Sequence, residues 1–171
     1  MEILNGILTR RSVRKYTDAI IPQEKAEELL KYGMYAPSAR NKQPWHFVLI
    51  NNKETFLKIE EFHPYSKMLK HAQWGIVVCG DEQLAHTPDY VPVDCAAATQ
   101  NILLAAHGMD MGAVWLGIYP RPERMAAMKE LLGLPPHIYA FSLISLGYPA
   151  QDEIKQPERF MPEKIHINKW K

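Results

Sequence analysis

Gly75-Ile76-Val77-Val78-Cys79-Gly80 is a short, unbroken apolar run near the middle of the chain. Its apolar residues follow one another with no polar residue at alternate positions, so the segment has no side suited to water. Strands of this kind lie inside a sheet that is covered on both faces. The stretch therefore predicts a layered domain in which helices pack on a central sheet.

The segments on either side supply further strands and the helices that cover them. We expect strands at 45–50, 113–118 and 140–146, and helices at 2–8, 22–35, 53–61, 94–107 and 121–132. Pro22 suits the first turn of a helix, and Gly133 suits the position after a last turn. Strands separated by helices over 171 residues predict one αβ domain. Residues 165–167 alternate like a strand in the tail.

The composition argues against several function classes. The formal net charge is +1, so we expect no general attraction to nucleic acid or to an anionic membrane. No apolar run suits a membrane span, and residues 1–6 do not resemble a secretion signal. Cys79 and Cys95 lack a metal-binding spacing, which indicates reduced thiols in a cytoplasmic protein.

Common catalytic motifs are absent from the sequence. It has no glycine-rich dinucleotide fingerprint, no P-loop, no G-x-S-x-G elbow and no H-E-x-x-H motif. The seven histidines are scattered along the chain, so we expect no zinc site. Paired acids such as Glu27-Glu28 and Glu60-Glu61 lie on expected helices, where a solvated face explains them.

The segment Thr9-Arg10-Arg11-Ser12-Val13-Arg14-Lys15-Tyr16 is strongly basic. If it is extended, Arg10, Ser12 and Arg14 share one face, because alternate residues of a strand point the same way. Two guanidinium groups around a hydroxyl suit a phosphate or another anion. A solvated basic edge or a nucleic-acid patch is the alternative.

Three further features suit a ligand-binding site, and each has a simpler explanation. Ser38, Asn41 and Gln43 lie on a loop stiffened by two prolines and could bind a heteroaromatic ring, but turn chemistry also explains them. Gly117 would let a ligand approach the backbone, or it simply ends a strand. Arg159 either completes an anion clamp or lies on the surface.

Taken together, these segments resemble the FMN-dependent nitroreductase family. The resemblance covers nearly the whole chain, in the order Arg10–Arg14, Ala36–Trp45, Asp94–Asn101, Trp115–Gly117 and Ser145–Pro149, followed by Arg159. It implies an α+β fold, a three-layer αβα sandwich that forms an intertwined homodimer with FMN at the interface. Residues 1–171 would form one FMN-binding domain, with a tail from about 155 to 171 wrapping around the partner subunit.

The resemblance also implies roles for individual residues. Arg10 and Ser12 would hold the FMN phosphate and ribityl chain, with Arg11 adjoining and Arg159 returning to the phosphate. Arg14 would lie toward the N1/O2 edge of the flavin. Pro37, Ser38 and Asn41 would come from the partner subunit. Trp115, Leu116 and Gly117 would line one ring face, with backbone N–H near N5. Arg40 and the loop 62–67 receive no role.

The activity implied is a ping-pong transfer of electrons. NADH or NADPH would deliver hydride to flavin N5, and a small-molecule acceptor such as a nitroaromatic or a quinone would then take the electrons. Arg14 is the candidate for stabilising negative charge at N1/O2. The alternatives are an FMN-binding sensor or storage module without turnover, and a specialist of the same superfamily such as a reductive dehalogenase.

Overall fold

The central sheet is four-stranded, antiparallel and ordered β1-β2-β4-β3. The structure is a computed structural model that describes residues 2–150 and 155–170. The strands are β1 (Trp45–Ile50), β2 (Trp74–Asp81), β3 (Gly112–Gly117) and β4 (Ile138–Gly147). β2 and β4 take the two inner positions, and every residue of β2 is buried. The apolar stretch at 75–80 is therefore an inner strand, as predicted.

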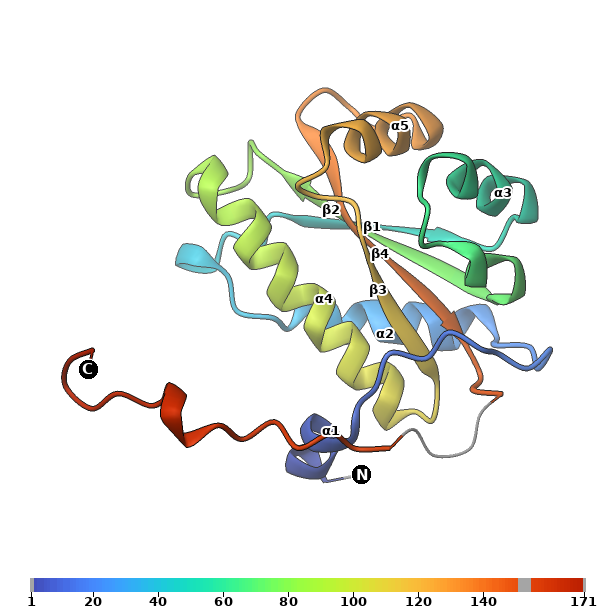
Figure 1. Cartoon of the computed structure of the whole chain (residues 1–171). Helices are drawn as coiled ribbons and strands as arrows, with labels where there is room; N and C mark the ends of the chain where they lie inside the picture. Colours follow the sequence, from blue (N-terminus) through green and yellow to red (C-terminus); the bar gives the residue numbers. More distant parts are fainter. Residues whose placement is uncertain (1, 151–154, 171) are drawn as a thin grey trace.

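Helices cover both faces of this sheet, which gives the three-layer αβα arrangement (Figure 1). α2 (Gln23–Met34) and α4 (Val91–Gly108) pack on one face, whereas α3 (Lys53–Phe62) and α5 (Pro122–Leu132) pack on the other. The short helix α1 (Ile3–Thr9) lies against α4. The expected α+β fold class is confirmed. Within 2–150 and 155–170, no helix is long and apolar enough to cross a membrane.

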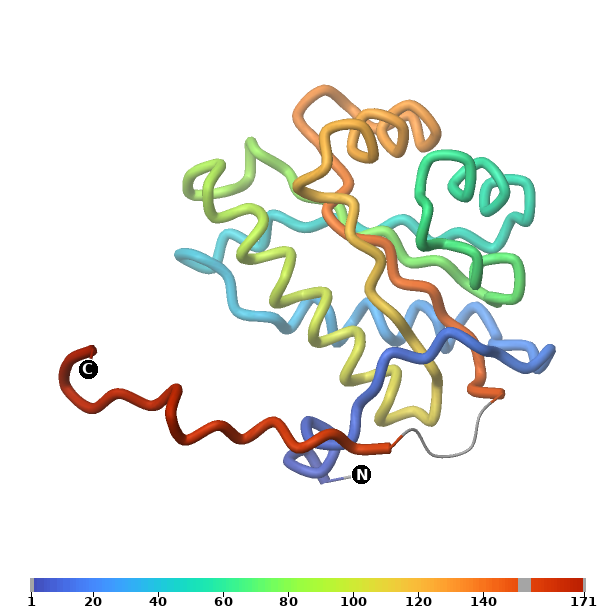
Figure 2. The backbone as a smooth tube through the Cα atoms, in the orientation of Figure 1, coloured from blue at the N-terminus to red at the C-terminus, as the bar shows by residue number. Residues whose placement is uncertain are grey.

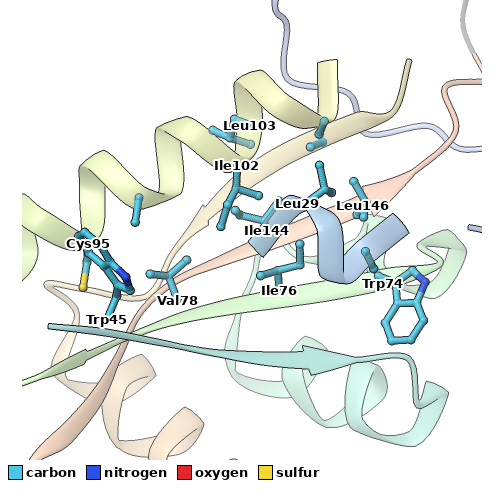
Figure 3. Packing of buried hydrophobic residues seen from close by; sticks show 14 of the residues in the cluster. Leu29, Trp45, Trp74, Ile76, Val78, Cys95, Ile102, Leu103, Ile144 and Leu146 are labelled. Carbon is cyan, nitrogen blue, oxygen red and sulfur yellow. The ribbon is translucent and has the colours of Figure 1, made fainter. Parts of the chain in front are cut away.

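Alternate residues of the inner strands divide the core into two parts. On one face of the sheet, Ile76 and Ile144 pack with Leu29 of α2 and Ile102 of α4 (Figure 3). On the other face, Leu143 packs with residues of α3 and α5. Burial of each such side chain stabilises the fold by about 1.5–3 kcal/mol. Both helical layers are thus held to the same two strands.

Most expected elements agree with the structure except at their ends. α4 begins at Val91 and not at Asp94, because Pro92 fits the first helical turn, where a missing N–H costs nothing. Gly133 ends α5 in a left-handed conformation with a φ of 62°. The strand-like alternation at 165–167 does not correspond to a strand. The described part of the tail has one 3₁₀ turn, η4 (Pro162–Lys164), and no strand.

Residues 10–16 cross the end of the sheet as an irregular segment and not as a regular strand. The segment meets β3 through an isolated bridge between Ser12 and Ala113. There the Val13 amide donates to the Ala113 carbonyl at 3.0 Å. A second isolated bridge joins Tyr16 to Pro149, so the extended conformation expected for the basic segment is present at these two contacts and not as a continuous strand.

Two paired glycines make room for this segment. Gly112 and Gly147 face each other at the ends of β3 and β4. A Cβ atom on Gly112 would lie 2.6 Å from the Val13 side chain, and one on Gly147 would lie 2.6 Å from the Tyr16 ring. The Tyr16 hydroxyl lies 3.0 Å from the Ser145 hydroxyl, and burial raises the pKa of Tyr16 to about 12. Tyr16 is therefore a buried, neutral anchor for the basic segment.

We expect Gly147→Ala to lower the free energy of unfolding by about 1–3 kcal/mol, the usual cost of overpacking. The added methyl group would overlap the Tyr16 ring and push residues 10–16 away from the sheet. Gly108→Ala is the matched control, because a Cβ atom there would meet nothing within 4 Å. Urea unfolding measures both variants, and equal stability of the two would contradict this account of the glycine pair.

Candidate functional site

β3 is an outer strand, and part of its backbone faces away from the sheet. The Ala113 carbonyl accepts a hydrogen bond from Val13, so it points away from β4. Backbone groups alternate in direction along an antiparallel strand, so those of Trp115 and Gly117 point to the same outer side. We call the outward backbone groups of Trp115 and Gly117 the β3 edge. Their N–H groups are oriented to donate to a ligand beside the strand.

The space beside Gly117 is open. The nearest neighbour of a Cβ atom built on Gly117 would be the Tyr119 carbonyl oxygen, at 3.9 Å. Trp115 is half-buried and packs edge-on against Phe141, with ring centroids 5.6 Å apart. The Leu116 side chain is buried in the core on the α3 and α5 side. A ligand at the β3 edge would thus meet the backbone groups of Trp115 and Gly117.

Arg10, Arg11 and Arg159 lie close enough for the charges of Arg11 and Arg159 to act on Arg10, and we call these three residues the arginine cluster. Burial and the positive charges of Arg159 and Arg11 lower the pKa of Arg10. Among the described residues, none of the three forms an ion pair with a carboxylate. The buried Nε atom of Arg11 also has no hydrogen-bond partner. Like charges held together without a counter-ion are costly, so the cluster is suited to an anion.

The remaining polar residues of the basic segment differ in their surroundings. Ser12 and Arg14 are exposed, whereas Val13 between them is buried. Arg11 does not simply point to the opposite face. Its Nη1 atom turns back and donates to the Leu8 carbonyl at the end of α1, at 2.9 Å. The shared face that alternation predicts for Arg10, Ser12 and Arg14 stays a prediction, because the segment is not a regular strand.

The loop between α2 and β1 is held in an unusual backbone conformation. Arg40, Asn41 and Gln43 all have positive φ angles, of 50°, 55° and 50°. The Gln43 amide donates to Ser38 Oγ at 2.9 Å, and the Asp94 carboxylate accepts from the Ala39 amide at 3.0 Å. Side-chain acceptors thus stabilise a conformation that non-glycine residues rarely adopt. Pro37 and Asn41 are exposed on this loop.

The structure places this loop and the arginine cluster at opposite ends of α4. The loop is bonded to Asp94 in the first turn of α4, whereas Thr9, next to the cluster, lies 2.8 Å from His107 in the last turn. At about 1.5 Å of rise per residue, Asp94 and His107 are about 20 Å apart along the helix. Within one chain, Ser38 and Asn41 are therefore not brought to Arg10 and Ser12.

A group centred on the Gly117 carbonyl was not predicted from the sequence. This oxygen accepts from Arg124 Nη1 at 2.8 Å and lies 3.1 Å from His63 Nε2. Arg124 belongs to α5, and His63 follows α3, so three separate elements meet here. The Arg124 guanidinium also lies over the Tyr65 ring, 5.7 Å from its centroid. We call Arg124, His63 and Tyr65 the carbonyl clamp.

The hydrogen bonds define the protonation state of His63. The Tyr65 amide donates to His63 Nδ1 at 3.3 Å, so Nδ1 holds no proton. Nε2 then bears the proton and donates to the Gly117 carbonyl. Burial and the neighbouring Arg124 charge lower the pKa of His63, in agreement with a neutral ring. No local sequence signal marks these residues, because the partners lie far apart in the chain.

The other reactive side chains do not gather into a second site. Cys79 and Cys95 are buried free thiols, and burial raises the pKa of each to about 12, so both are protonated. Over the described ranges 2–150 and 155–170, no group of three or more His, Cys, Asp or Glu side chains is arranged to hold a metal ion. The β3 edge and the arginine cluster are therefore the best candidate for a functional site.

His63 should make the stability pH-dependent. Because its pKa lies below the usual 6.5, the folded protein binds fewer protons than the unfolded chain as the pH falls. The free energy of unfolding should therefore decrease between about pH 7 and 5. His63→Gln should show a smaller decrease in urea titrations, and the exposed control His86→Gln should behave like the wild type. Equal pH dependence in all three proteins would contradict the assignment of a neutral His63.

Known proteins resemble the chain along its whole length. The family model described as "Nitroreductase family" matches residues 7–78 and 62–148. A protein of Archaeoglobus fulgidus named "Putative NADH dehydrogenase/NAD(P)H nitroreductase" is 49% identical over 172 residues, which cover 99% of each chain.

Two solved structures share the fold. The FMN-dependent nitroreductase of Clostridium difficile R20291 has a TM-score of 0.86 and 26% identity, covering 97% of this chain and 99% of its own. The NADPH:FMN oxidoreductase of Vibrio harveyi, solved with NAD⁺, has a TM-score of 0.86 and 27% identity, covering 99% of this chain and 78% of its own. The expected resemblance is confirmed, and the chain belongs to the nitroreductase family.

Proposed function

We propose that this protein transfers electrons from NADH or NADPH, through bound FMN, to small conjugated acceptors such as nitroaromatics and quinones. The enzyme class and the cofactors agree with the names of its relatives: the chain is an FMN- and NAD(P)H-dependent oxidoreductase. The observation that supports this site most directly is the arginine cluster, which has no carboxylate partner among the described residues and lies beside the β3 edge.

The arginine cluster fits the phosphate end of FMN. A phosphate would be the counter-ion for the positive charges of Arg10, Arg11 and Arg159. The unpartnered Nε atom of Arg11 offers one further donor close to this position. Ser12 is exposed next to Arg10 and would donate its hydroxyl to the phosphate or the ribityl chain.

The β3 edge fits the flavin ring. The open space beside Gly117 admits a flat ligand against the backbone, and the outward N–H groups of Trp115 and Gly117 are donors for ring nitrogen or oxygen. Arg14 is exposed in the same basic segment as Ser12. We assign Arg14 to the N1/O2 edge, where a cation stabilises the negative charge of the reduced ring.

When bound, FMN would supply the redox chemistry of a ping-pong electron transfer from NADH or NADPH to the acceptor. The chain's own residues bind the phosphate, orient the ring and stabilise its charge. Such a mechanism requires no side-chain nucleophile. This agrees with the state of the two cysteines, which are buried and protonated.

The complete site needs a second copy of the chain. Ser38 and Asn41 lie at the other end of α4 from the arginine cluster, so in one subunit they cannot reach the same ligand. A partner subunit would bring Pro37, Ser38 and Asn41 to the flavin.

Exposed apolar side chains also favour a partner. Ile3 and Leu4 of α1 are 77% and 72% exposed, and Phe160 and Trp170 of the tail are 72% and 85% exposed. The described part of the tail extends away from the body of the chain (Figure 2). Large apolar side chains that are exposed on α1 and on the tail favour an interface with another chain. We therefore propose a homodimer in which α1 and the tail pack against the partner.

Arg10→Ala should weaken FMN binding by about 1.5–3 kcal/mol, the size of a hydrogen bond to a charged group. Lys15→Ala is the matched control, because Lys15 is an exposed cation of the same segment that receives no role at the site. Quenching of flavin fluorescence measures both dissociation constants. An Arg10→Ala protein that binds FMN as tightly as the Lys15→Ala protein would overturn the phosphate assignment.

Sedimentation equilibrium should give twice the chain mass of 19.7 kDa. Replacing the exposed Phe160 and Trp170 together with Ser should shift the protein toward the monomer, because the tail would lose apolar area buried against the partner. It should also weaken FMN binding, since the site needs both subunits. A monomeric wild type that binds FMN normally would contradict the shared site.

A further inference from the structure

We propose that Arg124 is a positioning residue for flavin reduction, which it serves by fixing the Gly117 carbonyl and by holding a positive charge beside the β3 edge. His63 and Tyr65 complete the carbonyl clamp and fix Arg124 in place. The inference rests on the proposed function, because it takes the flavin ring to lie against Gly117.

The clamp fixes one peptide group from two directions. Arg124 Nη1 and His63 Nε2 both donate to the Gly117 carbonyl, at 2.8 and 3.1 Å. The His63 side chain is only 2% exposed, and Ser66 Oγ donates to the His63 carbonyl at 2.7 Å, so this donor is held rigidly. β3 is an outer strand and pairs along its length with β4. Without the two hydrogen bonds from Arg124 and His63, Gly117 at its end would be freer to move.

The clamp and the flavin would act on the same residue. The N–H and C=O groups of Gly117 point to the same side of β3, because both belong to one outward-facing position of the strand. Arg124 therefore lies one hydrogen bond away from the residue whose N–H faces the ring. It reaches Gly117 from α5, whereas Arg14 belongs to the basic segment, so the two cations come from different elements.

The Arg124 charge is not neutralised within the described residues. None of their carboxylates forms an ion pair with Arg124, and the guanidinium instead lies over the Tyr65 ring. Arg124 is half-buried, so water screens its charge less than that of an exposed arginine. Reduction of the flavin adds negative charge to the ring, and a nearby unscreened cation favours that state.

Two substitutions of Arg124 separate the charge from the hydrogen bond. Arg124→Gln keeps a donor for the Gly117 carbonyl but removes the charge, whereas Arg124→Lys keeps the charge. Arg121→Gln is the matched control, since Arg121 is an exposed arginine at the start of the same helix. Tyr65→Ala removes the support beneath Arg124 at an exposed position, so it leaves the folded core intact.

The test is an anaerobic titration of the FMN-loaded proteins against a redox dye of known potential. At a fixed dye ratio, Arg124→Gln should lower the ratio of reduced to oxidised flavin about tenfold, as loss of one nearby charge predicts. Arg124→Lys and Arg121→Gln should stay within about twofold of the wild type. Tyr65→Ala should also lower the ratio of reduced to oxidised flavin. If Arg124→Gln does not fold, Tyr65→Ala provides the test in its place.

Two outcomes would overturn the inference while leaving the proposed function intact. In the first, Arg124→Gln and Tyr65→Ala bind FMN and keep the ratio of the Arg121→Gln control. In the second, Arg124→Lys and Arg124→Gln lower the ratio equally, so the charge has no part in the effect. A wild-type protein that retains no FMN would instead overturn the proposed function, and this inference with it.

Discussion

The candidate site depends on how residues 13–16 pack against the end of the sheet. Val13 and Tyr16 fit against the paired glycines Gly112 and Gly147, where a Cβ atom would overlap them. This contact holds the basic segment beside the end of β3, where Ser12 and Arg14 are exposed. Without it, the guanidinium groups would have no fixed relation to the β3 edge. An apolar packing contact thus determines the geometry of a charged site.

The second constraint is the length of α4. Its last turn contacts the segment that leads into the arginine cluster, and its first turn holds the strained loop with Ser38 and Asn41. A rigid helix keeps these groups too far apart for one ligand. Two chains arranged so that the loop of one meets the cluster of the other would make two equivalent sites. In this account, the exposed apolar residues of α1 and the tail provide the contact area between the chains.

Much of this architecture can be predicted from sequence, because the relevant signals are local. The unbroken apolar run at 75–80 marks an inner strand, and Gly133 marks the end of α5. The arginine pattern of residues 10–14 indicates an anion site, although the turn of Arg11 toward the Leu8 carbonyl depends on where α1 ends. The alternation at 165–167 is typical of a strand, but a strand also needs a neighbouring strand to pair with.

The carbonyl clamp could not be predicted, for a different reason. His63, Arg124 and Gly117 lie on separate elements, and each residue alone fits an ordinary helix end, helix surface or strand end. Only the antiparallel order of the sheet brings them together. The same reasoning applies to the Asp94 carboxylate, which accepts a hydrogen bond from the Ala39 amide in a loop much earlier in the chain.

If the proposed function is right, this chain holds FMN that nicotinamide nucleotides can reduce. The visible absorption spectrum of the purified protein, loaded with FMN and kept anaerobic, tests this before and after addition of NADH or NADPH. We expect a flavin spectrum that bleaches with at least one of the two nucleotides. A flavin spectrum that persists with both would indicate a flavin-binding protein without this activity, and failure to bind FMN at all would contradict the assignment of the site.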